Sequence, residues 1–98
     1  MEKIEYKIKN GKKSVTKSVE IMDLSWTDWC KVQDLRILMN NPNGSAFTYG
    51  AKFVQLYLGK SDAEMESWRD SITDDDDFFT EMMVLVKEIA NAVTDKKK

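Results

Sequence analysis

The sequence contains no histidine, one cysteine and one proline. Without histidine, the chain lacks the side chain that most often serves as a general base and as a metal ligand. The single cysteine, Cys30, excludes an internal disulfide, and we interpret it as a small buried apolar side chain beside Trp26 and Trp29. A nucleophilic cysteine would need a basic partner such as histidine, so we expect no enzymatic activity and no cofactor.

A surplus of positive charge is also missing, as are long apolar runs. The net charge of −2 argues against nucleic acid as the main partner, because phosphate binding needs basic residues in excess. No apolar run approaches the length of a membrane span, and the N-terminus lacks the apolar stretch of a signal peptide. With the lone cysteine, this favours the reducing cytoplasm. The length of 98 residues predicts a single domain, 1–98, with a thin core.

Residues 3–21 predict a β-hairpin, because apolar and polar residues alternate on both sides of Asn10-Gly11. A two-residue loop would place Tyr6 opposite Val15, and a four-residue loop would place Ile8 there; both registers keep the apolar residues on one face. A basic outer surface is assigned to Lys3, Lys7, Lys9, Lys12, Lys13 and Lys17. This surface is either a solvated strand face or a docking surface for an acidic partner.

The remainder predicts helices at about 25–39, 46–58, 61–71 and 75–94. The fold class is therefore α+β, an N-terminal β-hairpin followed by a compact bundle of three to four helices. Ser25 is the expected N-cap of the first helix, and we expect the rest of the chain to pack around this helix. Its apolar residues cover more than one stripe, so it is either buried on two sides or partly faces a partner.

Several residues predict helix ends and close contacts. Gly50 either allows close packing within the second helix or marks a later start, and Gly59 fits its C-terminal cap. Ser61 and Glu64 form a capping box. The run Asp74–Asp77 has contiguous carboxylates that point in different directions, which favours helix capping; weak binding of a divalent cation is the alternative.

The candidate functional residues are apolar. Trp26, Trp29 and Trp68 indicate core or interface packing, or else an aromatic stacking platform. Met39, Met65, Met82 and Met83 either fill the core or form an adaptable binding groove. The predicted partner-binding residues are Trp26, Trp29, Met39, Met82, Met83 and Val86. We also expect self-association, because the first and last helices are more apolar than one thin core requires. Residues 61–81 hold nine acids against one base, which with the basic hairpin would suit head-to-tail binding.

The stretch from Asn10-Gly11-Lys12-Lys13-Ser14-Val15-Thr16-Lys17-Ser18-Val19-Glu20-Ile21 into Asp23-Leu24-Ser25-Trp26, followed by an apolar helix, a loop and two further helices, resembles the small tail assembly chaperones of long-tailed bacteriophages. The resemblance implies a non-enzymatic protein of the host cytoplasm that coats the tape measure protein, a long helical and apolar-rich polypeptide, during tail assembly. It also implies that Lys96-Lys97-Lys98 could be encoded by a frameshift site, although a helix-end charge is the structural alternative.

Two other classes of function fit the same sequence. One is a small phage or bacterial inhibitor that masks a host or defence protein. The other is a structural tail or connector component that remains in the particle. Neither class needs a catalytic residue, a cofactor or a metal.

Overall fold

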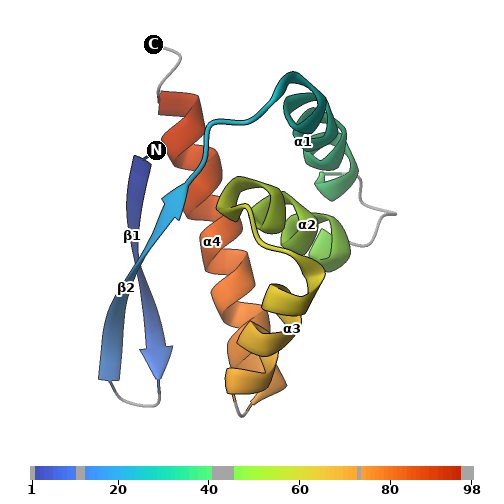
Figure 1. The fold of residues 1–98 in the computed structure, drawn as a ribbon. Helices are drawn as coiled ribbons and strands as arrows, with labels where there is room; N and C mark the ends of the chain where they lie inside the picture. The colour runs from blue at the N-terminus through green and yellow to red at the C-terminus, as the bar shows by residue number, and fades with distance from the viewer. Residues whose placement is uncertain (1, 11–12, 41–45, 73, 96–98) are drawn as a thin grey trace.

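The computed structural model describes residues 2–10, 13–40, 46–72 and 74–95 (Figure 1). The elements are β1 (Glu2–Asn10), β2 (Lys13–Ile21), α1 (Trp26–Met39), α2 (Ala46–Leu58), α3 (Asp62–Ser71) and α4 (Asp75–Asp95). The predicted α+β class, a hairpin followed by four helices, is confirmed. Gly11 of the predicted turn, residues 41–44 of the predicted loop and the terminal lysines 96–98 lie outside the described residues.

Helix α4 lies at the centre of the molecule, between the hairpin and α2 (Figure 1). The buried apolar side chains are Ile4, Tyr6, Ile21, Val32, Phe53, Val54, Tyr57, Met82, Leu85 and Ile89. The expectation that the first helix organises the chain is wrong. Helix α1 packs on α2 and fully buries only Val32, because its apolar residues are spread around the helix and four of them, Trp26, Trp29, Ile37 and Leu38, are exposed. The apolar surface of α4 is instead covered from two sides by its own chain.

The two strands pair in the second of the two registers left open, with Ile8 opposite Val15. The pairing continues to Asn10 and Lys13. The apolar residues of both strands share one face, as predicted, and this face lies against α4.

The assignment of Lys17 to the outer surface of the hairpin is wrong. Lys17 lies opposite Tyr6 and has the same parity as Val15 and Val19, so it lies on the inner face. Lys3, Lys7 and Lys9 have the opposite parity to the inner residues of β1. Lys13 shares the parity of Lys17 but is exposed at the start of β2, and Lys12 lies outside the described residues.

The predicted helix starts are present. The Ser25 hydroxyl accepts a hydrogen bond from the backbone N–H of Asp28 at 3.2 Å. Both bonds of the capping box exist in α3, where the Ser61 N–H donates to the Glu64 carboxylate at 3.0 Å and the Glu64 N–H donates to the Ser61 hydroxyl at 3.2 Å. Asp74 caps α4, since its carboxylate accepts from the N–H of Asp76 at 2.9 Å. Each cap satisfies a backbone donor that the helix leaves unpaired.

Helix α2 ends in a Schellman motif at Gly59, which has a φ of 65°. The Lys60 N–H donates to the carbonyl of Gln55 and the Gly59 N–H to that of Leu56, both at 3.2 Å. The segment after β2 crosses this helix end, because the Met22 N–H donates to the Tyr57 carbonyl at 2.8 Å. A side chain at Gly59 would overlap the sulfur of Met22. The predicted C-terminal cap is therefore confirmed.

Gly50 lies within α2, so the helix does not start later. A Cβ at this position would lie 3.1 Å from Cγ2 of Val86 and 3.4 Å from Cε of Met83. Glycine therefore lets α2 approach α4 closely, which decides between the two readings of Gly50.

Candidate functional site

The two tryptophans of α1 stack on each other at the surface. The ring centroids of Trp26 and Trp29 are 5.5 Å apart and their planes differ by 12°. The side chain of Trp26 is 76% exposed and that of Trp29 is 39% exposed. The large apolar surface of Trp26 is therefore left in water by this chain alone, which excludes a core position for it.

A third large apolar side chain continues the same face of the helix. Ile37 is 72% exposed and follows Trp26 by eleven residues, which is about three helical turns. Cys30 lies one turn after Trp26 and is only partly buried, so its prediction as a buried apolar residue is wrong. We call Trp26, Trp29, Cys30 and Ile37 the outer stripe of α1. Of the two readings of this wide apolar surface, the structure supports the one in which part of the helix is left uncovered.

The other four predicted partner-binding residues do not join the outer stripe. Met82 is fully buried in the core, so its assignment to a partner surface is wrong. It is buried because α4 is covered on two sides. Met39, Met83 and Val86 are partly buried and surround Gly50, where a Cβ would lie 3.6 Å from the Met39 sulfur. They fill the space where α1, α2 and α4 meet.

The third tryptophan lies elsewhere. Trp68 packs edge-on against Phe78 with ring centroids 5.8 Å apart, and the ammonium group of Lys60 lies 5.7 Å from the Trp68 ring centroid. The three tryptophans therefore do not stack into one platform. The sequence analysis missed a third exposed aromatic, Phe79, which is 50% exposed and stacks on Phe47 with ring centroids 5.2 Å apart.

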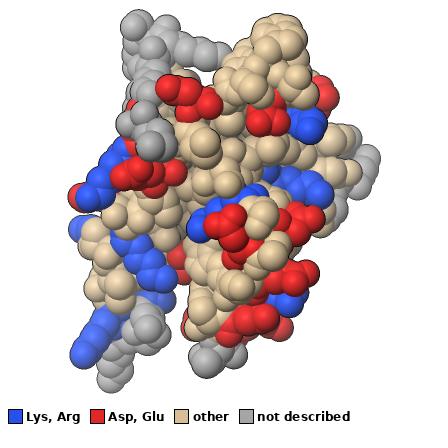
Figure 2. Space-filling view, viewed as in Figure 1, with Lys and Arg blue, Asp and Glu red and all other residues tan. Residues whose placement is uncertain are grey.

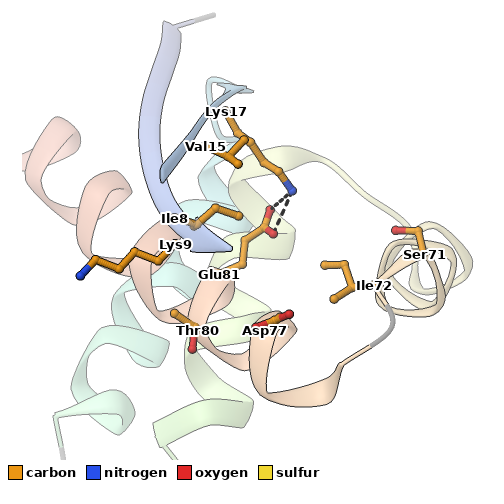
Figure 3. A pocket seen from close by; sticks show the side chains of 9 residues that line it. All are labelled: Ile8, Lys9, Val15, Lys17, Ser71, Ile72, Asp77, Thr80 and Glu81. Carbon is orange, nitrogen blue, oxygen red and sulfur yellow. Dashed lines mark hydrogen bonds and ion pairs between the residues drawn. The ribbon is translucent and has the colours of Figure 1, made fainter. Parts of the chain in front are cut away.

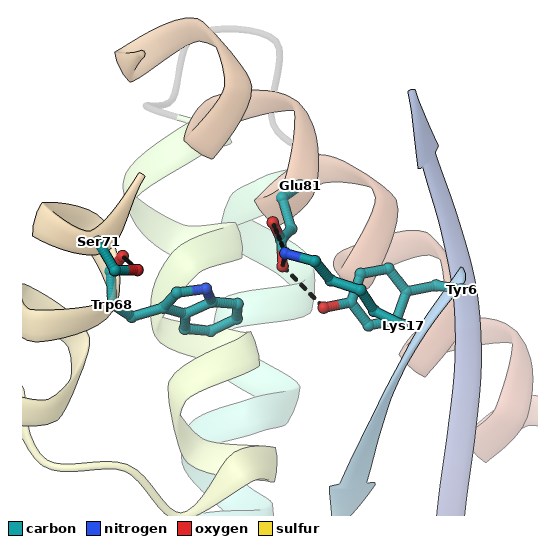
Figure 4. A network of polar contacts seen from close by, with 5 residues as sticks. All are labelled: Tyr6, Lys17, Trp68, Ser71 and Glu81. Carbon is teal, nitrogen blue, oxygen red and sulfur yellow. Dashed lines mark hydrogen bonds and ion pairs between the residues drawn. The ribbon is translucent and has the colours of Figure 1, made fainter. Parts of the chain in front are cut away.

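A buried carboxylate joins the hairpin to α4, and the sequence analysis missed it (Figure 4). The Glu81 side chain accepts a hydrogen bond from the Tyr6 hydroxyl at 2.7 Å and forms an ion pair with the Lys17 ammonium group at 3.1 Å. Glu81 is 1% exposed. Burial, then the hydrogen bond to Glu81, raises the pKa of Tyr6 above its usual value, so the phenol keeps its proton and remains a donor. Two features of the sequence indicate this contact. Glu81 lies four residues before Leu85, on the apolar face of the last helix, and Lys17 has the same parity as the inward-facing residues of its strand.

A cleft of about 250 Å³ opens beside this group, between the hairpin and the turn that joins α3 to α4 (Figure 3). Its lining is Ile8, Lys9, Val15, Lys17, Ser71, Ile72, Asp77, Thr80 and Glu81. Lys17 reaches across the cleft wall to both oxygens of Glu81. The charges of Lys17 and Glu81 are therefore paired with each other and hold the hairpin against α4.

Lysines and carboxylates are unevenly spread over the face of the molecule drawn in Figure 2. Lysines line the hairpin side, and carboxylates gather over α3 (Figure 2). Within the part of the chain that the structure describes, no three metal-ligating side chains form a group that could hold an ion. In the same described ranges, no helix is both long enough and apolar enough to cross a bilayer.

The comparisons with known proteins add no family. No protein-family model, curated protein or solved structure matches this chain.

Proposed function

We propose that this chain is a non-enzymatic, protein-binding chaperone that coats the tape measure protein during phage tail assembly. The outer stripe of α1 is the contact surface. The observation that carries the proposal is the pair Trp26 and Ile37, which are 76% and 72% exposed on one face of one helix. Each Å² of apolar surface left in water costs about 25 cal/mol, so a partner that covers this stripe gains free energy.

The geometry of the stripe suits a helical partner. Its exposed side chains recur over about three turns of α1, which is roughly 16 Å along the helix axis. A partner helix presents its own apolar side chains at the same repeat, so the two surfaces interdigitate. Stacked tryptophans are rigid and large, the properties of residues that dominate binding energy at interfaces.

The resemblance supplies the identity of the partner. Tape measure proteins are long, helical and rich in apolar residues, and they need cover until the tail tube surrounds them. The order of elements in this fold, the hairpin first and the helices after it, is the layout on which the resemblance rests. A surface without catalytic groups is sufficient for this task.

The proposal expects a very long helical protein to be encoded next to this chain, and co-expression of the two tests it. The long protein should become soluble and co-purify with the wild-type chain. The double substitution Trp26→Gln with Ile37→Gln should lower its recovery at least fivefold. The matched control is Lys3→Ala with Lys7→Ala on the outer face of the hairpin, which should leave recovery unchanged. Equal recovery with both variants, or no recovery with the wild type, would overturn the proposal.

Mass spectrometry of purified particles separates the neighbouring functions. A chaperone leaves before the particle is finished, so the chain should be absent. Its presence at a fixed copy number would instead identify a structural tail or connector component. Co-purification of a host or defence protein, with no effect on the long protein, would identify an inhibitor.

A further inference from the structure

A groove with a basic rim runs between α1 and α2. Its volume is about 400 Å³, and it is lined by Lys31, Asp34, Leu35, Lys52, Gln55, Leu56 and Lys60. Leu35 and Leu56 are half-buried and provide apolar contacts, whereas three of the polar residues are lysines and only one is acidic. We call these seven residues the basic groove.

The charges of two of the three lysines are not paired with a carboxylate of the described residues. Lys31 and Lys52 are exposed, and neither forms an ion pair with a described residue. Lys60 is engaged within the chain, because it lies over the Trp68 ring and its charge helps to lower the pKa of Glu64. The positive potential available to a partner therefore comes mainly from Lys31 and Lys52.

A complementary feature lies at the start of α4. Phe79 is 50% exposed, and Asp75 and Asp76 precede it by four and three residues. Residues at these spacings are neighbours on a helix surface, so two exposed carboxylates flank an exposed aromatic ring. We call these three residues the acidic knob. Its ring stacks on Phe47, which fixes the direction in which it points.

We propose that the acidic knob of one copy of this chain inserts into the basic groove of a second copy. Phe79 would enter the groove between Leu35 and Leu56, while its two flanking carboxylates meet Lys31 and Lys52. Opposite charges at the rim set the orientation, and the aromatic ring supplies the apolar contact that salt alone cannot screen.

The two surfaces are different parts of the same chain, so the way in which copies combine decides the form of the assembly. Two copies that exchange knobs close as a two-fold dimer, whereas copies that each take the knob of a different neighbour form a larger ring or an open filament. The groove and the outer stripe occupy different sides of α1, since Leu35 and Lys31 are not on the face of Trp26 and Ile37. Assembly through the knob thus leaves the outer stripe uncovered, and the inference goes beyond the proposed function.

Charge reversal with mixing tests the proposal. Sedimentation velocity of the wild type should show assembly that rises with concentration and falls with salt. The groove variant, Lys31→Glu with Lys52→Glu, and the knob variant, Asp75→Lys with Asp76→Lys, should each sediment as a monomer. An equimolar mixture of the two should assemble again, because each reversed groove meets a reversed knob and each native groove meets a native knob.

Three controls make the outcome decisive. Circular dichroism checks that both variants are folded, and Phe79→Ser removes the knob without changing charge and should also give a monomer. Trp26→Gln with Ile37→Gln should assemble like the wild type, which separates this proposal from the proposed function. Variants that still assemble alone, or a mixture that stays monomeric, would overturn the inference. A wild type that is monomeric at high micromolar concentration would also overturn it and leave an acidic segment of another protein as the occupant.

Discussion

The hydroxyl of Tyr6 donates a 2.7 Å hydrogen bond to the carboxylate of Glu81, a residue seventy-five positions later in the chain. Glu81 is 1% exposed, so its charge depends on donors from the protein, and both side-chain donors come from the hairpin. A shift of either strand by one residue would turn Tyr6 or Lys17 to the outer face and leave a buried carboxylate short of donors. The contact therefore specifies the register in which the hairpin docks on α4.

Substitution of Tyr6 by Phe should lower the free energy of unfolding by about 2 kcal/mol, because a hydrogen bond to a buried charged group is lost while the ring is kept. Urea unfolding followed by circular dichroism measures this change. Lys17→Met is the matched comparison. The Lys17 side chain is 39% exposed, so solvent already screens its charge and the loss should stay below about 1 kcal/mol. A Phe variant as stable as the wild type would show that Glu81 does not need this donor.

The stabilisation that Tyr6 provides should disappear at alkaline pH. The pKa of Tyr6 is raised in the folded state from its ordinary value of 10.0, so its contribution is complete below pH 10.0 and is lost as the pH rises through the folded-state pKa. The difference in unfolding free energy between the wild type and Tyr6→Phe should therefore shrink steadily above that pH. Urea titrations at several pH values from neutral to alkaline measure it. A constant difference would mean that the phenol ionises equally in both states.

Helix ends were the most predictable part of this fold. Ser25, Ser61 and Gly59 act through hydrogen bonds or backbone angles that involve neighbours only a few residues away, so a short stretch of sequence contains the whole interaction. The alternation in the hairpin likewise predicted its inner face. The choice between the two registers was beyond local sequence, because both kept the apolar residues on one face. In the observed register Tyr6 lies opposite Lys17, and both side chains reach Glu81.

The arrangement of the helices could not be predicted in the same way. Helices α1 and α4 are both rich in apolar residues, and the one difference visible in their sequences is that those of α4 share a face whereas those of α1 are spread around the helix. Met82 and Trp26 illustrate the difference, since both were assigned to a partner surface, yet Met82 is fully buried and Trp26 is 76% exposed. The outcome depends on which faces the hairpin and α2 can reach together, and this is a property of the whole chain.

The capping box of α3 should stabilise the protein in a pH-dependent way. Ser61→Ala should lower the free energy of unfolding by about 1 kcal/mol, because the N–H of Glu64 loses its partner. Hydrogen bonds from the backbone and side chain of Ser61 lower the pKa of Glu64, so its contribution is present above its ordinary pKa of 4.5 and is lost as the pH falls through the lowered value. Glu64→Gln keeps the hydrogen bond and removes the titration. Its unfolding free energy should therefore change less than that of the wild type below pH 4.5.

The exposed residues of α1 should contribute to binding far more than to folding. Ile37→Gln should change the free energy of unfolding by no more than about 0.5 kcal/mol, because Ile37 is 72% exposed and glutamine is a good helix former. Trp26→Gln should cost up to about 1 kcal/mol, since it removes the stacking contact with Trp29. Phe53→Ala, at a fully buried position of α2, is the contrast and should cost about 3–5 kcal/mol. Thermal and urea unfolding of the three variants measure these differences. A large loss of stability at Ile37 would mean that this face of α1 supports the fold, and the stripe would then have no need of a partner to account for its apolar side chains.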